Sequence, residues 1–165
     1  MWFKITSFLA FLLKSTNEHG VHSPFVFNFV TKCLYNKKKY HVDKNVNVLL
    51  NSIEYFNVQN AVIQDPEIKK LVTENFPKVQ FGQQMLDLLF LKSLSTSEFN
   101  SLLDDERLHN NSMLIINGIY TDKKKLREWK RLVALPEITV SMDLYHCGIL
   151  FIRREQMKEH FTIRI

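Results

Sequence analysis

The sequence predicts an α/β protein built on one mostly parallel sheet, with helices on both faces and an antiparallel hairpin at its end. Three observations lead to this fold class. Short apolar runs alternate with amphipathic helical stretches along most of the chain. The run 86–91 is apolar except for Asp87, which is typical of a strand covered on both faces. Two further apolar runs flank Tyr145-His146-Cys147, which indicates a hairpin.

The first helix is expected at the start of the chain, where apolar residues recur at spacings of three and four: Trp2, Ile5, Phe8, Leu9 and Leu12. The apolar stretch 5–13 is too short to span a bilayer, and no small-x-small cleavage site follows it. We therefore expect a helix packed on the domain, with attachment to a membrane surface as the alternative.

A second helix is expected to begin at Ser23-Pro24. Serine is a favoured N-cap, and proline suits the first helical position because its missing N–H would have no partner there. Gly20 permits a turn before this helix and leaves His19 and His22 in the connecting loop. Because no carboxylate partner or cysteine accompanies them in this motif, both histidines are expected to hydrogen-bond backbone groups beside the helix start.

The rest of the chain alternates strand and helix signals. Strands are expected at 61–63, 79–81, 86–91, 113–116, 138–144 and 148–153. Helices are expected at 44–56, after the cap Asp65, after the capping box Ser95–Glu98 and after the cap Asp122. The alternating residues 160–165 predict a half-buried strand or extended tail, in which His160 is a structural hydrogen-bonding group. We expect five or six strands with the hairpin 138–153 at one edge.

Length and composition fit one domain over 1–165, divided into an N-terminal helical pair (1–40) and a core (44–165). The net charge of +5 is a mild excess, and the lysine clusters 37–39 and 123–125 are too short to predict nucleic-acid binding. The two cysteines lie far apart and outside any metal-ligand spacing, so neither a metal site nor a disulfide is expected. A reducing, cytoplasmic location fits this cysteine usage.

Both ends of the chain carry specific sequence stretches, HGVHSPFVFNFVTK near the start and VSMDLYHCGILFIRREQMKEHFTIRI at the end. These stretches resemble a bacterial group of class I S-adenosylmethionine-dependent methyltransferases. The resemblance covers most of the chain and is weakest between 60 and 110. It implies a Rossmann-like sheet that holds the cofactor at the carboxyl ends of its first strands, from which this chain lacks about one strand-helix unit.

Measured against this resemblance, the cofactor-binding positions have changed. Gln64 stands where the acidic residue after the first strand is expected, and Asp65-Pro66 replaces the start of the glycine-rich turn. After the second strand, the sequence around Gly82 offers glutamines in place of the acid that would hold the ribose. Lys92-Ser93 stands where an Asp-Gly pair is expected. We treat Gln64, Asp65, Gly82 and Lys92 as vestigial cofactor positions.

The resemblance also places a substrate cleft at the same edge of the sheet. Asn117 and Gly118 replace adjacent aspartates there, and Tyr120 follows them. His19 and His22 join this cleft if the loop between the first two helices lies over the carboxyl ends of the strands. The carboxylates that would bind a metal or act as a base are missing. No catalytic residue is assigned.

The sequence therefore predicts a methyltransferase-like protein that is catalytically inactive. S-adenosylmethionine is the cofactor implied by the resemblance, and the changed positions predict that it is not bound. One alternative is an active methyltransferase with an altered cofactor loop. Another is a small adaptor that binds a protein partner, or a second copy of itself, through an apolar patch on its N-terminal helices. Whether the chain is an enzyme is left open.

Overall fold

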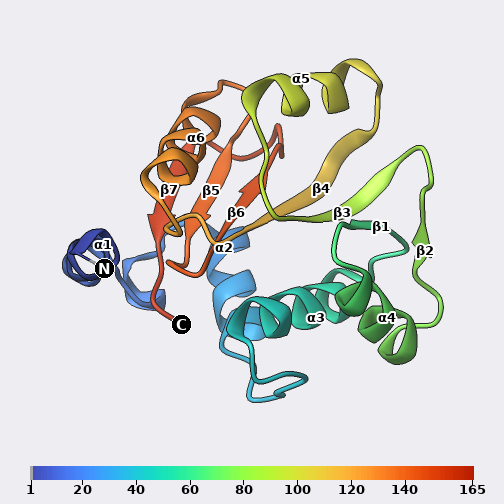
Figure 1. Cartoon of the computed structure of the whole chain (residues 1–165), viewed down its shortest axis with the longest axis horizontal. Helices are drawn as coiled ribbons and strands as arrows, with labels where there is room; N and C mark the ends of the chain where they lie inside the picture. Colours follow the sequence, from blue (N-terminus) through green and yellow to red (C-terminus); the bar gives the residue numbers. More distant parts are fainter. Residues whose placement is uncertain (1) are drawn as a thin grey trace.

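The computed structural model describes residues 2–165 and places one seven-stranded sheet between two layers of helices (Figure 1). The strand order is β2-β1-β3-β4-β6-β5-β7, and β6 runs antiparallel to both of its neighbours. This is the predicted α/β class, a three-layer and Rossmann-like arrangement. The strands are β1 (Asn60–Ile63), β2 (Gln80–Phe81), β3 (Leu86–Leu91), β4 (Leu108–Asn117), β5 (Val140–Asp143), β6 (Cys147–Phe151) and β7 (Glu159–Thr162).

The helices begin at the caps that the sequence predicts. Ser23, Asp65, Ser95 and Asp122 each accept a hydrogen bond from a backbone N–H in the first turn of the helix that follows. The helices are α1 (Trp2–Lys14), η1 (Glu18–Gly20), α2 (Pro24–Phe29), η2 (Val30–Leu34), α3 (Lys44–Phe56), α4 (Pro66–Asn75), α5 (Thr96–Asp104) and α6 (Lys123–Ala134). The segment η2 continues α2 as a π-helical turn.

Each face of the sheet has its own apolar core. On one face, α2, η2, α3 and α4 cover every second side chain of the strands β1, β3, β4, β5 and β6. On the other face, α5 and α6 pack on β3, β4 and β6 through side chains that include Phe99, Trp129 and Leu132. Because β3 is covered on both sides, five of its six residues are buried, as its continuous apolar sequence predicts.

The connection from β2 to β3 contains only residues 82–85, although it passes from one side of β1 to the other. Parallel strands are usually joined by a crossover of a dozen residues or more that contains a helix. Here no helix follows β2, so the face of β1 that points toward α5 is incompletely covered. Val62 is only half-buried and lies in an open cavity of about 300 Å³ beside Leu89 and Leu102.

Two predictions about the sheet are wrong. There are seven strands, and the hairpin β5–β6 does not lie at the edge, because β7 pairs in parallel with β5 and forms the edge itself. The predicted C-terminal strand is confirmed. Its partner is β5, where Ser141 pairs with His160 although the two residues lie 19 positions apart in the sequence. In addition, β4 begins at Leu108 and extends through the polar residues 109–112, which carry no apolar strand signal.

The expected helix α1 forms, and it packs on the domain through few side chains. Of its described residues only Phe11 is buried. Contacts at its two ends hold the helix beyond the β7 edge (Figure 1): Tyr145 Oη donates to the Lys4 carbonyl at 3.0 Å, and Thr16 pairs with Ile163. Within residues 2–165 no helix is both long and apolar enough to cross a membrane.

Candidate functional site

The carboxyl ends of β1 and β3 form the crevice in which ligands bind in open sheets of this kind. The chain leaves β1 toward β2 on one side and returns to β3 on the other, so the order of connections reverses between these two strands. Such a switch point separates the two loops and leaves a crevice at the strand ends. Here the loops begin with Gln64-Asp65 and Lys92-Ser93.

The two loops at this crevice bind each other. Gln64 Oε1 accepts a hydrogen bond from the Lys92 backbone N–H at 2.8 Å. Lys92 Nζ lies 3.1 Å from Asp65 Oδ2. Three of the four predicted cofactor positions therefore meet, as the sequence predicts, but they do so by spanning the crevice. The Asp65 carboxylate and Gln64 Oε1, the acceptors that a ligand there would need, are already paired.

Asp65 has a second structural role as the N-cap of α4. Its Oδ1 accepts hydrogen bonds from the Glu67 and Ile68 N–H groups at 3.1 and 3.4 Å. The Lys92 ammonium, followed by the Ile68 N–H, lowers the pKa of Asp65 below its usual value of 3.8. Asp65 is therefore an ionised carboxylate that stabilises a helix start and an ion pair, and it is poorly suited to accept a proton.

Gly82, the fourth predicted cofactor position, does not join this group. It has a φ of +81°, in the left-handed region that favours glycine, and nothing lies within 4 Å of where a Cβ would stand. The glycine therefore serves the short turn after β2 rather than a close backbone approach to another group.

The predicted cleft residues after β4 are used in packing contacts. Asn117 Oδ1 accepts a hydrogen bond from Asn45 Nδ2 of α3 at 2.6 Å. Gly118 has a φ of +68°, and a Cβ there would lie 2.6 Å from Thr121 Oγ1. Tyr120 Oη donates a 2.6 Å hydrogen bond to Asp143 Oδ2. Burial, reinforced by this carboxylate, raises the pKa of Tyr120.

Within residues 2–165 no side-chain hydrogen bond or ion pair joins His19 or His22 to the cleft residues, and the chain after His22 leads to the opposite edge of the sheet. Ser23, directly after His22, donates a hydrogen bond to Gln156 Oε1 at 3.0 Å, and Gln156 follows the end of β6. Because β6 is antiparallel, that end lies at the amino edge of the other strands. Both histidines are exposed, and neither ring makes the predicted backbone hydrogen bond within residues 2–165. The His19 ring lies 3.7 Å from Glu18 instead.

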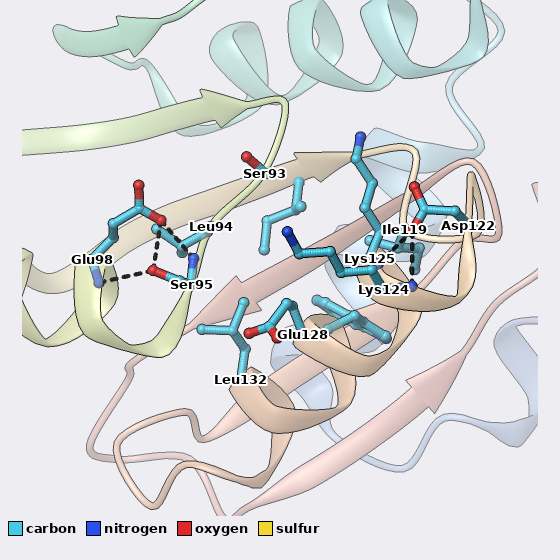
Figure 2. A pocket seen from close by; sticks show the side chains of 12 residues that line it. Ser93, Leu94, Ser95, Glu98, Ile119, Asp122, Lys124, Lys125, Glu128 and Leu132 are labelled. Carbon is cyan, nitrogen blue, oxygen red and sulfur yellow. Dashed lines mark hydrogen bonds between the residues drawn. The ribbon is translucent and has the colours of Figure 1, made fainter.

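A larger cavity of about 500 Å³ opens between the first turns of α5 and α6 (Figure 2). Its rim carries the Ser95–Glu98 capping box and Asp122, whose Oδ1 accepts hydrogen bonds from the Lys124 and Lys125 N–H groups. Its interior is apolar, with residues from β4 and α6. None of the predicted site residues lines this cavity. Ser95, Glu98 and Asp122 in its lining are engaged at the starts of their own helices.

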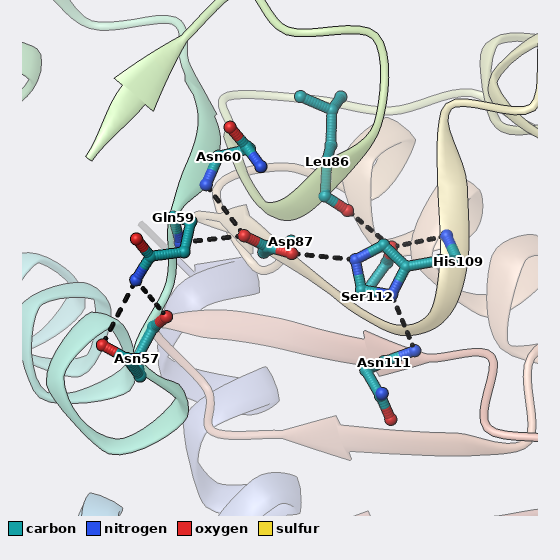
Figure 3. A network of polar contacts seen from close by, with 8 residues as sticks. All are labelled: Asn57, Gln59, Asn60, Leu86, Asp87, His109, Asn111 and Ser112. Atoms are coloured by element: carbon teal, nitrogen blue, oxygen red, sulfur yellow. Dashed lines mark hydrogen bonds and ion pairs between the residues drawn. The ribbon is translucent and has the colours of Figure 1, made fainter. Parts of the chain in front are cut away.

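A polar network that the sequence did not predict lies at the amino edge of the sheet (Figure 3). Asp87 Oδ2 accepts hydrogen bonds from the Gln59 and Asn60 N–H groups, both at 2.8 Å. His109 Nε2 lies 2.9 Å from Asp87 Oδ1, and the Asn111 N–H donates to His109 Nδ1 at 3.2 Å. A ring nitrogen that accepts carries no proton, so Nε2 donates to the carboxylate. The one signal for this network was a charged residue inside an apolar strand.

This network resembles a catalytic Asp–His pair only in composition. Both ring nitrogens of His109 are engaged, so neither is free to accept a proton from a substrate. Ser112 Oγ accepts the His109 N–H at 2.8 Å and donates to the Leu86 carbonyl at 2.6 Å, so its hydroxyl is also used. The network therefore ties the starts of β1, β3 and β4 together.

Other reactive groups are similarly unsuited to chemistry. Burial raises the pKa of the Cys33 thiol to about 12 and also raises that of Cys147, so both thiols stay protonated. Within residues 2–165 no three His, Cys, Asp or Glu side chains gather as a metal site requires. Comparisons of the chain with protein-family models, with curated proteins and with solved structures found no match.

Proposed function

We propose that this chain is a methyltransferase-like protein that does not transfer methyl groups and acts instead as a binding protein. The resemblance at both ends of the sequence suggests the methyltransferase type. The arrangement of the strands is consistent with it, because the first strands are parallel and β5 and β6 form a hairpin. The closed crevice argues against the activity.

The observation that carries this proposal is the position of Lys92. Its ammonium lies 3.1 Å from Asp65 at the switch point, and its backbone N–H is bound by Gln64. S-adenosylmethionine carries a positive sulfonium and needs acceptor groups for its ribose and amino group. An ammonium beside the crevice repels a cation, and the acceptors nearby are already occupied. The residues present therefore do not fit this cofactor.

Calorimetry with S-adenosylmethionine and S-adenosylhomocysteine on the full chain tests the proposal. We expect no binding of either compound, even at ligand concentrations of about 1 mM. The variants Lys92→Met and Lys124→Met form a matched pair, because both remove one lysine charge but only the first opens the crevice. The proposal would be overturned in favour of an active enzyme by two results together. The wild-type chain would bind either compound with micromolar affinity, and this affinity would change in Lys92→Met but not in Lys124→Met.

A second candidate function, that of an adaptor, is supported by the outer face of α1. Four large apolar side chains on this helix are at least half exposed: Trp2 (82%), Ile5 (52%), Leu9 (55%) and Leu13 (89%). Trp2, Ile5, Leu9 and Leu12 recur at the a and d spacing of a heptad and form an apolar seam along the helix. This seam faces away from the buried Phe11. No charged residue interrupts the seam, so a second copy of α1 fits against it without charge repulsion.

Size-exclusion chromatography with light scattering tests this pairing. We expect the wild-type chain to form a dimer whose population rises with concentration, because each copy removes the apolar seam of the other from water. Ile5→Asp and Leu9→Asp should give monomers. Val42→Asp is the matched control, because Val42 is also exposed (97%) but lies outside α1. If the wild-type chain stayed monomeric at all concentrations, the proposed pairing of two copies through α1 would be contradicted.

A further inference from the structure

A cavity of about 370 Å³ lies between α1, α6 and the β5–β7 edge, apart from the crevice between β1 and β3. Side chains from five parts of the fold line it, among them Phe11 of α1, Trp129 and Lys130 of α6, Asp143 of β5 and His160 of β7. We propose that this cavity binds a small organic anion with an aromatic ring system. The inference does not depend on whether the crevice binds S-adenosylmethionine.

The walls of the cavity favour a flat apolar body. Phe11 and Trp129 are 4% and 3% exposed, so they form rigid walls. Tyr120 lines the same cavity and is held in place by its hydrogen bond to Asp143 and by stacking on Tyr145. Aromatic faces arranged in this way contact a planar ring system over a large area at little cost in conformational entropy.

The charges that line the cavity favour an anion. Lys14 and Lys130 contribute two ammonium groups, and neither forms an ion pair with a carboxylate within residues 2–165. Asp143 is the one carboxylate in the lining, and both of its oxygens are occupied. Its Oδ2 accepts from Tyr120 and its Oδ1 accepts the Tyr145 N–H at 2.8 Å. The lining therefore carries two ammonium groups and one carboxylate, which leaves an excess of one positive charge.

His160, an exposed residue of β7, supplies a polar contact in the lining of the cavity. Its Nδ1 lies 2.8 Å from Ser141 Oγ, which confirms the predicted hydrogen-bonding role of this residue. Its Nε2 forms no hydrogen bond with the described residues and is left for a ligand. The neighbouring Trp129 ring lies 6.4 Å away, centroid to centroid. A ligand that places its ring near Trp129 therefore has a hydrogen-bonding partner within reach.

Calorimetry with two probes of the same shape tests the proposal. Naphthalene-2-sulfonate carries one negative charge, and naphthalene-2-sulfonamide is its neutral counterpart. We expect the sulfonate to bind at least about fivefold more tightly, with an affinity that falls as salt is added. Lys14→Met and Lys130→Met should each weaken the sulfonate about fivefold and leave the sulfonamide unchanged. Ala10→Trp, which fills the cavity from α1, should weaken both probes.

Control variants separate this cavity from the other apolar surfaces. Lys124→Met removes a lysine from the cavity between α5 and α6, and Leu9→Asp alters the outer face of α1. Both should keep the wild-type affinity for the sulfonate. The proposal would be overturned if the two probes bound with equal affinity or if the sulfonate did not bind. It would also be overturned if a control variant lost binding while Lys14→Met and Lys130→Met kept it. A cofactor-binding result at the crevice would leave it unaffected.

Discussion

Tyr120 and Asp143 form a pair in which the half-buried phenol donates a 2.6 Å hydrogen bond to the buried carboxylate. They lie on different elements, the loop after β4 and the end of β5, and Asp143 is only 4% exposed. Burial raises the pKa of Asp143, and the Tyr120 hydroxyl opposes this effect. The hydroxyl therefore helps to keep a buried carboxylate ionised.

Tyr120→Phe should lower the free energy of unfolding by about 2–3 kcal/mol at pH 7.5, because Asp143 Oδ2 is left buried without a donor. The pKa of Asp143 should rise further in the variant. For an acid with a raised folded pKa, the native state binds more protons than the unfolded state, so stability increases as pH falls through that pKa. The deficit of the variant should therefore shrink in urea titrations at pH 4.5. A deficit that is the same at both pH values would contradict this account.

Gly148→Ala should destabilise the chain by about 1–3 kcal/mol. A Cβ at this position of β6 would lie 2.5 Å from Cζ3 of Trp129, and the indole ring cannot give way because it is packed in the core. Near-ultraviolet circular dichroism should report a displaced indole. In urea titrations, the double variant with Trp129→Leu should lose less than the sum of the single losses. Strict additivity would show that the two residues do not compete for space.

Asp87→Ala should cost about 2–3 kcal/mol, because two backbone N–H groups and the His109 ring lose one shared acceptor. His109→Ala should cost less, since the carboxylate keeps its two backbone donors. Asp105→Ala is the matched control, because the exposed Asp105 side chain makes no hydrogen bond within the described residues. Urea unfolding measures all three. A ranking in which His109→Ala is the most harmful would contradict the assigned role of Asp87.

Lys92→Met should raise the pKa of Asp65 toward its usual value without restoring it fully, because the Glu67 and Ile68 N–H groups still bind the carboxylate. In the wild type this lowered pKa contributes stability that is present above the unfolded pKa and is lost as pH falls through the folded pKa. Carboxyl titration by NMR measures the change directly. An Asp65 pKa that is identical in wild type and variant would show that the ion pair is not formed in solution.

Local signals in the sequence predicted most of the elements correctly. The caps Ser23, Asp65, Ser95 and Asp122 all begin helices, because an N-cap satisfies donors within three residues of itself. The run 86–91 became a strand covered on both faces. The polar start of β4 was missed because residues 109–112 form an irregularity between the pairs of Leu108 and Met113 with β3, and side-chain hydrogen bonds of His109 and Ser112 hold it in place of an apolar pattern.

The candidate site was predicted less completely. Gln64, Asp65 and Lys92 meet because consecutive parallel strands end at one edge, which can be reasoned from the order of elements. These residues also bind one another across the crevice. This pairing depends on distances between side chains, which the spacing of residues in the sequence does not determine. The position of His22 could not be predicted for a related reason. A loop between two helices is directed by what the second helix packs on, and here α2 begins at the amino edge, beside Gln156.

By itself the sequence determined the fold class, the helix starts and the covered strands, because these depend on hydrogen bonds and apolar periodicity within a few residues. Only the tertiary structure decided which polar groups are paired and which surfaces stay open. It placed Tyr120 against Asp143, 23 residues apart, and left the apolar face of α1 in solvent. Such outcomes depend on the free energy of contacts between distant segments, which becomes defined only when the sheet has brought those segments together.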